Sequence, residues 1–206
     1  MYRASGALCL ADGSTDAEST QLIQTLSKND SRIQHVKISE NLGIVGNTNK
    51  GLKQADGEFI AFLDHDDILS EFALAEVVLA LNKDKNLDLI YSDEDKLSDD
   101  GRSRLIPFFK PDWSPDLLLG VNYITHFVVA RKSIVDKIGG LRKGFDGAQD
   151  YDFLLRFTEQ TDKIKHISKM LVACYDNCVI SKLFCSAKSH YKKPVFCGSV
   201  SQSIWR

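Results

Sequence analysis

The sequence lacks any long hydrophobic run. Among its 206 residues, no window approaches the roughly 18 consecutive apolar residues that cross a bilayer as a helix, and residues 1–4 do not begin a signal peptide. A basic excess is also missing, because the formal net charge is -2, and proteins that track nucleic-acid phosphates usually carry surplus Lys and Arg. We therefore expect no transmembrane segment and no nucleic-acid partner.

Closely paired cysteines are also absent. Cys9 lies near the start, and the other four of the five cysteines fall in the last quarter: Cys174, Cys178, Cys185 and Cys197. No pair has the CxxC spacing that is typical of zinc sites, and an odd count does not suit a disulfide framework. We expect free thiols in a reducing, cytoplasmic compartment.

What is present indicates one α/β domain. Hydrophobic residues make up 43% and charged residues 26% of the chain, which is ordinary for a globular protein. Short apolar runs alternate with amphipathic stretches, a pattern typical of a mostly parallel sheet covered by helices. We expect strands at residues 32–38, 58–63, 87–91 and 123–130, and helices at residues 43–55, 72–81, 134–138 and 148–158.

The sharpest feature is an acidic cluster that follows an apolar run. Residues 58–63 read as a buried parallel strand, and Asp64-His65-Asp66-Asp67 comes directly after it. One alternative is that Asp66 or Asp67 only caps the next helix. The other is that acidic residues at several strand ends meet at the ligand-binding edge of the sheet, where Mg²⁺ or Mn²⁺ would offset their repulsion.

Two further acidic segments are candidates for the same site. Asp93-Glu94-Asp95 follows the strand expected at residues 87–91; it does not fit the EF-hand spacing, which leaves a solvated turn or a place in the site. Gln149-Asp150 opens a helix after a glycine-containing loop, so Asp150 is either a structural helix-start residue or a general base. We expect His126 and His166, each alone in an apolar strand, to be core or rim residues.

Taken in order, these clusters resemble the inverting GT-A glycosyltransferases of family 2, especially bacterial enzymes that build O-antigen and other surface polysaccharides. The matching text is ADGSTD, NLGIVGNTNKGLKQADGEFIAFLDHDD, YSDEDKL, PFFKPDWSPDLLLGVNYITHFVVARK and GGLRKGFDGAQDYDFLLR. It covers residues 7 to 171. The resemblance implies the GT-A fold, a mostly parallel central sheet flanked by helices with its first strand missing.

The resemblance also implies the donor side of a site. Asp12 would contact the base or ribose, Asp64 would lie towards the ribose, and Asp66 would hold the metal, Mn or Mg, that bridges the diphosphate. The donor would be a UDP- or dTDP-sugar. The family's first Asp in the early acidic turn is replaced here by Ala11.

On the acceptor side, Asp150 would deprotonate the attacking hydroxyl, and the sugar would be transferred with inversion to a glycan or lipid-linked glycan. Asp93, Asp95 and Gln149 would line the donor or acceptor site, a weaker implication. A cytoplasmic protein follows from the resemblance, and peripheral association with the cytoplasmic face of the inner membrane stays open as an alternative.

Both ends depart from the family pattern. The chain starts almost on the early acidic turn, and after Leu171 the expected His-Trp-Arg is absent. We therefore expect a domain at residues 1–171 that is incomplete at its N-terminus, followed by a divergent tail at residues 172–206. A non-catalytic remnant that binds nucleoside diphosphate weakly is the alternative function. A nucleotidyltransferase is disfavoured, because it predicts a Gly-rich phosphate loop near the N-terminus.

Overall fold

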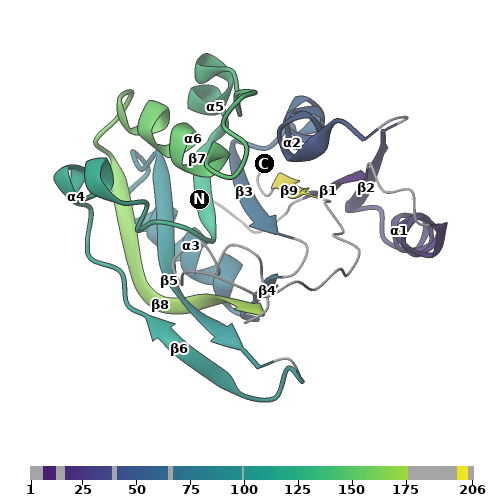
Figure 1. The fold of residues 1–206 in the computed structure, drawn as a ribbon, viewed down its shortest axis with the longest axis horizontal. Helices are drawn as coiled ribbons and strands as arrows, with labels where there is room; N and C mark the ends of the chain where they lie inside the picture. Colours follow the sequence, from purple (N-terminus) through teal and green to yellow (C-terminus); the bar gives the residue numbers. More distant parts are fainter. Residues whose placement is uncertain are drawn as a thin grey trace.

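The computed structural model describes residues 7–12, 17–38, 41–64, 67–98, 100–175 and 199–203. They form a β-sheet with helices on both faces (Figure 1). In chain order the elements are β1 (Ala7–Asp12), α1 (Ala17–Asn29), β2 (Ile33–Lys37), α2 (Gly43–Gln54), β3 (Phe59–Asp64), β4 (Asp67–Leu69), α3 (Ala73–Lys83), β5 (Leu89–Leu97), β6 (Arg104–Phe108), α4 (Pro115–Gly120), β7 (Val128–Arg131), α5 (Lys132–Ile138), α6 (Gln149–Thr158), β8 (Ile164–Tyr175) and β9 (Ser199–Ser203). None of the described helices is long and apolar enough to cross a membrane.

The predicted α/β class and the helix-flanked central sheet are confirmed, but the sheet is mixed rather than mostly parallel. Its strand order is β2-β1-β9-β3-β7-β5-β8-β4, with β6 paired to β5. Only β1–β2 and β5–β8 are parallel among the described pairings. The apolar run at β3 correctly predicts a buried strand, but β3 pairs antiparallel with β7 and β9. An apolar run reports burial of both faces, and helices can cover both faces whatever the strand direction.

Alternating side chains of the central strands divide the core into two layers. Ile60 packs with α2, α4, α5 and α6, whereas its neighbours Phe59 and Ala61 pack with α3. Successive strand residues point to opposite faces, so these two clusters lie on the two sides of the sheet. The wider layer, with four helices, is the one that borders the site described below.

Several predicted boundaries are wrong. The strand expected at residues 87–91 continues to Leu97, so Asp93, Glu94 and Asp95 lie inside β5 and not in a turn. The sheet tolerates Asp95 because Arg104, on the adjacent strand β6, pairs with its carboxylate. β6 is a strand that the apolar pattern did not predict, and β8, which carries His166, extends to Tyr175.

Candidate active site

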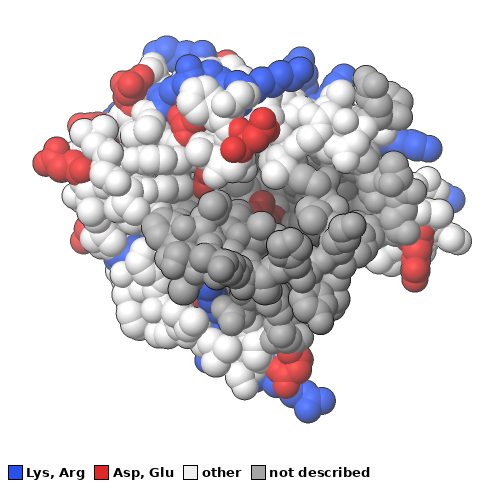
Figure 2. All heavy atoms as spheres, in the orientation of Figure 1, with Lys and Arg blue, Asp and Glu red and all other residues white. Residues whose placement is uncertain are grey.

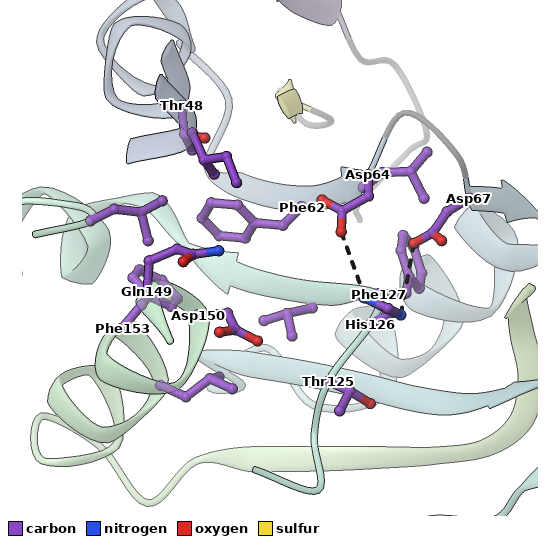
Figure 3. Close-up of a pocket in the computed structure, with 15 residues that line it drawn as sticks. Thr48, Phe62, Asp64, Asp67, Thr125, His126, Phe127, Gln149, Asp150 and Phe153 are labelled. Carbon is purple, nitrogen blue, oxygen red and sulfur yellow. Dashed lines mark ion pairs between the residues drawn. The ribbon is translucent and has the colours of Figure 1, made fainter. Parts of the chain in front are cut away.

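One pocket lies where the carboxyl end of β3 meets the N-terminus of α6 and the segment before β7 (Figure 3). Its cavity volume is about 100 Å³. The described residues that line it include three carboxylates, those of Asp64, Asp67 and Asp150, and no Lys or Arg. Carboxylates that converge in this way repel one another and any anionic ligand unless a cation lies among them.

Two of these carboxylates face His126. Asp64 is the last residue of β3, and its Oδ2 lies 3.6 Å from His126 Nε2. Asp67 is the first residue of β4, and its Oδ2 lies 4.0 Å from Nδ1 of the same ring (Figure 3). Burial favours the neutral imidazole, but the carboxylates of Asp67, Glu94 and Asp64 outweigh it and raise the pKa of His126.

A buried ion pair holds the segment that carries His126. Lys110 Nζ, whose side chain is fully buried, donates to Glu94 Oε2 at 2.8 Å and to two backbone carbonyls of the segment at 2.5 and 3.2 Å. Glu94 Oε2 also accepts from Thr125 Oγ1 at 2.7 Å and from the His126 amide at 3.0 Å. Thr125 and Phe127 have left-handed backbone angles, φ 45° and 53°, which cost free energy in residues other than Gly. These contacts therefore stabilise the strained backbone conformation of the segment that carries His126.

The third carboxylate comes from the opposite wall. Asp150 lies in the first turn of α6, is exposed, and accepts a hydrogen bond from Asn122 Nδ2 at 3.0 Å. Gln149 lies beside it and accepts from the Gly147 amide at 2.7 Å. The structure therefore brings three of the predicted site residues, Asp64, Gln149 and Asp150, to one pocket.

Asp93 and Asp95 do not line this pocket. Asp93 Oδ1 accepts from the Lys110 amide at 2.9 Å and lies 2.7 Å from His166 Nε2, and Asp95 pairs with Arg104. These contacts fasten β5 to its neighbours. The contact of Asp93 and Asp95 with donor or acceptor remains a prediction.

Of the remaining two predicted residues, Asp12 and Asp66, the structure describes only Asp12. Asp12 is the last residue of β1, and Asp64 is the last residue of β3. Both strands pair antiparallel with β9, so they run in the same direction and end at the same edge of the sheet. Asp66 lies outside the described residues.

Asp67 and Glu94 were not predicted individually as neighbours of the pocket, and His126 was expected only in a core or at a rim. The capping alternative for Asp67 is wrong, because Asp67 belongs to β4 and α3 begins later, at Ala73. The position of Asp67 in the acidic cluster was the available signal. Glu94 stood in the acidic segment Asp93-Glu94-Asp95, but its partners come from segments far along the chain, so the sequence did not show which carboxylate of the three reaches the pocket's surroundings.

The pocket's donor set fits a divalent cation of the Mg²⁺ or Mn²⁺ class. Asp64 presents a carboxylate that is 42% exposed at the pocket wall, and hard oxygen donors are what these ions prefer, usually together with substrate phosphates. Figure 2 shows acidic side chains exposed on the same face, below the basic side chains that gather over α5. Such a cation would offset the repulsion between these carboxylates and an anionic ligand.

Comparison with known proteins by sequence gives one family. Residues 7–139 match the family described as Glycosyl transferase family 2. The O-antigen biosynthesis protein RfbC of Myxococcus xanthus is 43% identical over 164 residues, which cover 80% of this chain and 13% of that protein. The hyaluronan synthase of Pasteurella multocida is 29% identical over 186 residues, covering 87% of this chain and 18% of the synthase. The chain thus spans a small part of these relatives' length.

Comparison by structure gives the fold. TarS of S. aureus, solved in complex with UDP-GlcNAc, superposes with a TM-score of 0.64 at 19% identity, covering 81% of this chain and 48% of TarS. The mannosyltransferase PcManGT of Pyrobaculum calidifontis, solved with GDP-Man and Mn²⁺, superposes with a TM-score of 0.54 at 14% identity, covering 80% and 46%. Both likenesses support the GT-A fold.

Proposed function

The chain belongs to glycosyl transferase family 2, and from that premise we propose that it moves a sugar from a nucleoside-diphosphate sugar to a hydroxyl group with inversion. We favour a UDP- or dTDP-sugar as donor and a glycan or lipid-linked glycan as acceptor. The UDP-GlcNAc complex of TarS supports the donor class, and the name of RfbC supports a place in surface-polysaccharide synthesis. A role in surface-polysaccharide synthesis implies that the chain acts at the cytoplasmic face of a membrane.

The observation that carries the proposal is that Asp64 and Asp150 line one pocket from opposite walls. Asp64 comes from the carboxyl end of β3 and Asp150 from the start of α6. A carboxylate opposite the donor side can accept the proton of an acceptor hydroxyl. The hydroxyl oxygen then bonds to the anomeric carbon while the bond to the nucleoside diphosphate breaks on the other face, so the configuration inverts.

Asp66 is the residue that we propose to hold the cation, with Asp64 towards the ribose and Asp12 towards the base or ribose of the nucleotide. Bound Mn²⁺ or Mg²⁺ supplies offsetting charge for the departing diphosphate. Asp64 also orients the donor, because its exposed carboxylate faces the pocket. Gln149, beside Asp150, contacts the acceptor side. The Mn²⁺ and GDP-Man complex of PcManGT supports a divalent cation beside the donor.

The proposal is tested by substituting Asp150 with Asn in the full chain. UDP-GlcNAc and dTDP-glucose are supplied with Mn²⁺ and a panel of simple glycosides, and released nucleoside diphosphate is measured together with the anomeric configuration of the product. We expect Asp150→Asn to lower turnover by about 10² to 10⁴-fold while donor binding is retained. Asp146→Asn, at an exposed position in the preceding turn outside the pocket lining, is the matched control and should leave turnover unchanged.

Three results would contradict the proposal: equal turnover in Asp150→Asn and the wild type, a product that retains the donor's configuration, or activity that survives complete removal of divalent ions. Binding of UDP-GlcNAc with no turnover of any donor would instead favour the non-catalytic nucleotide binder.

A further inference from the structure

A second group of ligand-type side chains lies at one end of the pocket. It consists of Asp67 on β4, His126 before β7 and Cys174 on β8, and one ligand atom from each lies within 4.8 Å of the other two. Cys174 Sγ lies 2.8 Å from His126 Nδ1, and Asp67 Oδ2 lies 4.0 Å from the same nitrogen. One oxygen, one nitrogen and one sulfur atom therefore surround a common point.

The backbone fixes this arrangement. Asp67 and Cys174 are direct partners in the antiparallel pairing of β4 with β8, and directly opposite residues in such a pair have close side chains. His126 is held from the third side by the hydrogen bond from its amide to Glu94. The cluster is therefore a built site in the sheet and not a chance meeting of long surface side chains.

Burial and charge both favour a cation at this point. The Asp67 side chain is 1% exposed, and Cys174 is buried. The carboxylates of Asp64, Asp67 and Glu94 all lie within 4.0 Å of the His126 ring. Lys110 already pairs with Glu94, whereas the buried carboxylate of Asp67 faces the ring with the thiol beside it. A divalent ion bound to the sulfur, nitrogen and oxygen supplies positive charge at that point.

We propose that Asp67, His126 and Cys174 bind a divalent ion of the zinc class. Thiolate, imidazole and carboxylate together are typical zinc ligands, whereas Mg²⁺ and Mn²⁺ prefer oxygen alone. Three protein ligands leave a fourth tetrahedral position, and it faces the pocket because Asp67 and His126 both line it. The spacing of the cysteines disfavours a multi-cysteine zinc site, and this site needs only one cysteine.

This site differs from the oxygen site proposed for the donor in its ligands and in the ion that it selects. It depends on no step of sugar transfer, so it stands or falls independently of the proposed function. Because it joins β4, β8 and the segment of His126, a bound ion also links three separate parts of the sheet edge.

Cobalt(II) is the probe that tests the site, because cobalt bound to a thiolate gives a charge-transfer absorption band that oxygen ligands do not give. Metal-free full-length chain is titrated with CoCl₂, then with ZnCl₂, and the spectrum is followed. We expect one cobalt ion per chain with a thiolate band that zinc removes. Cys174→Ser, a near-isosteric change, should abolish the band, and His126→Gln should weaken it.

Two controls separate this site from other metal binding. Cys9→Ser changes a cysteine on β1, a strand far from β8 in the sheet order, and should keep the band. Asp150→Asn should also keep it. A wild-type chain that binds cobalt without a thiolate band overturns the proposal without the need for any variant. A band that persists in Cys174→Ser, with circular dichroism showing a folded chain, overturns it equally.

Discussion

Lys110 and Glu94 form a buried ion pair that fixes the position of the segment carrying His126. The Lys110 side chain is 0% exposed and the Glu94 side chain 16% exposed. Burial lowers the pKa of Lys110, and the positive charges of Lys110 and His126 overcome the effect of burial and lower the pKa of Glu94. Their shared bonds fix the segment before β7, so this pair links packing in the core to the shape of the pocket.

Lys110→Met should destabilise the fold by about 3–5 kcal/mol, because it leaves Glu94 buried without its cation. The free energy of unfolding, measured in urea, checks this. The double variant Lys110→Met/Glu94→Gln should recover part of the loss, because it removes the uncompensated charge. Equal losses in the single and double variants would show that the ion pair is not the cause.

Asp152 gives the fold a dependence on acid pH. Its carboxylate accepts hydrogen bonds from Arg142 and Arg156, and the bond from Arg142 above all holds its pKa below the ordinary value of 3.8. The folded pKa is lower than the unfolded one, so this stabilisation is present above about pH 4 and is lost as the pH falls further.

We expect Asp152→Asn to cost roughly 1–2 kcal/mol at pH 7, a figure reduced because Arg142 is half exposed. The cost should shrink as the pH drops below 4. Urea unfolding of wild type and variant at pH 7 and at pH 3 measures it, and a cost that is constant with pH would exclude the ionised carboxylate as the source.

At the scale of elements, the turn after α5 is locked onto α2. The Asn49 side chain donates to the carbonyl of Leu141 at 2.8 Å and accepts from its amide at 2.9 Å. Gly140, with φ +69°, lies so close that an added Cβ would sit 2.5 Å from Asn49 Oδ1. The lock sets the position of α2 against the turn, and Leu141 of that turn lines the pocket.

Gly140→Ala should therefore cost more than Gly139→Ala. Both glycines have positive φ, but an added Cβ at Gly139 meets nothing within 4 Å. Left-handed strain alone costs about 1–2 kcal/mol, which is the loss expected at Gly139. The difference between the two melting temperatures measures the contacts of the added Cβ with Asn49 and with Leu52 Cδ1, which would lie 3.2 Å away. Identical melting temperatures would show that both neighbours move aside without cost.

The helices and strands also show which parts of the fold could be predicted from the sequence. The apolar run of β3, the acid at its end and the start of α6 with Asp150 were all predictable, because each depends on neighbours along the chain. Strand direction was not predictable, because an apolar run looks the same in a parallel and in an antiparallel strand. The hydrogen bonds of Glu94 with Lys110 and Thr125 join segments that lie far apart in the sequence, so no local pattern predicts them.

For the whole molecule, a ligand that binds only the folded chain raises its stability by mass action. UDP-GlcNAc with Mn²⁺ at 100 times its dissociation constant should add about 2.7 kcal/mol. Thermal unfolding with and without both additions measures this. Asp64→Ala should remove the shift and Asp146→Ala should keep it, whereas an equal shift in both variants would place the nucleotide elsewhere.

The distribution of the pocket's walls along the chain has a consequence for synthesis. Its residues come from α2, β3, β4, β7 and the segment before it, the turn after α5, and α6. A ribosome that has released β3 has delivered Asp64, but the opposite wall emerges only with Asp150, after most of the sheet. Domains are completed as units during translation, so a nascent chain stalled before α6 would carry the proposed donor-side residue Asp64 but lack the proposed base Asp150.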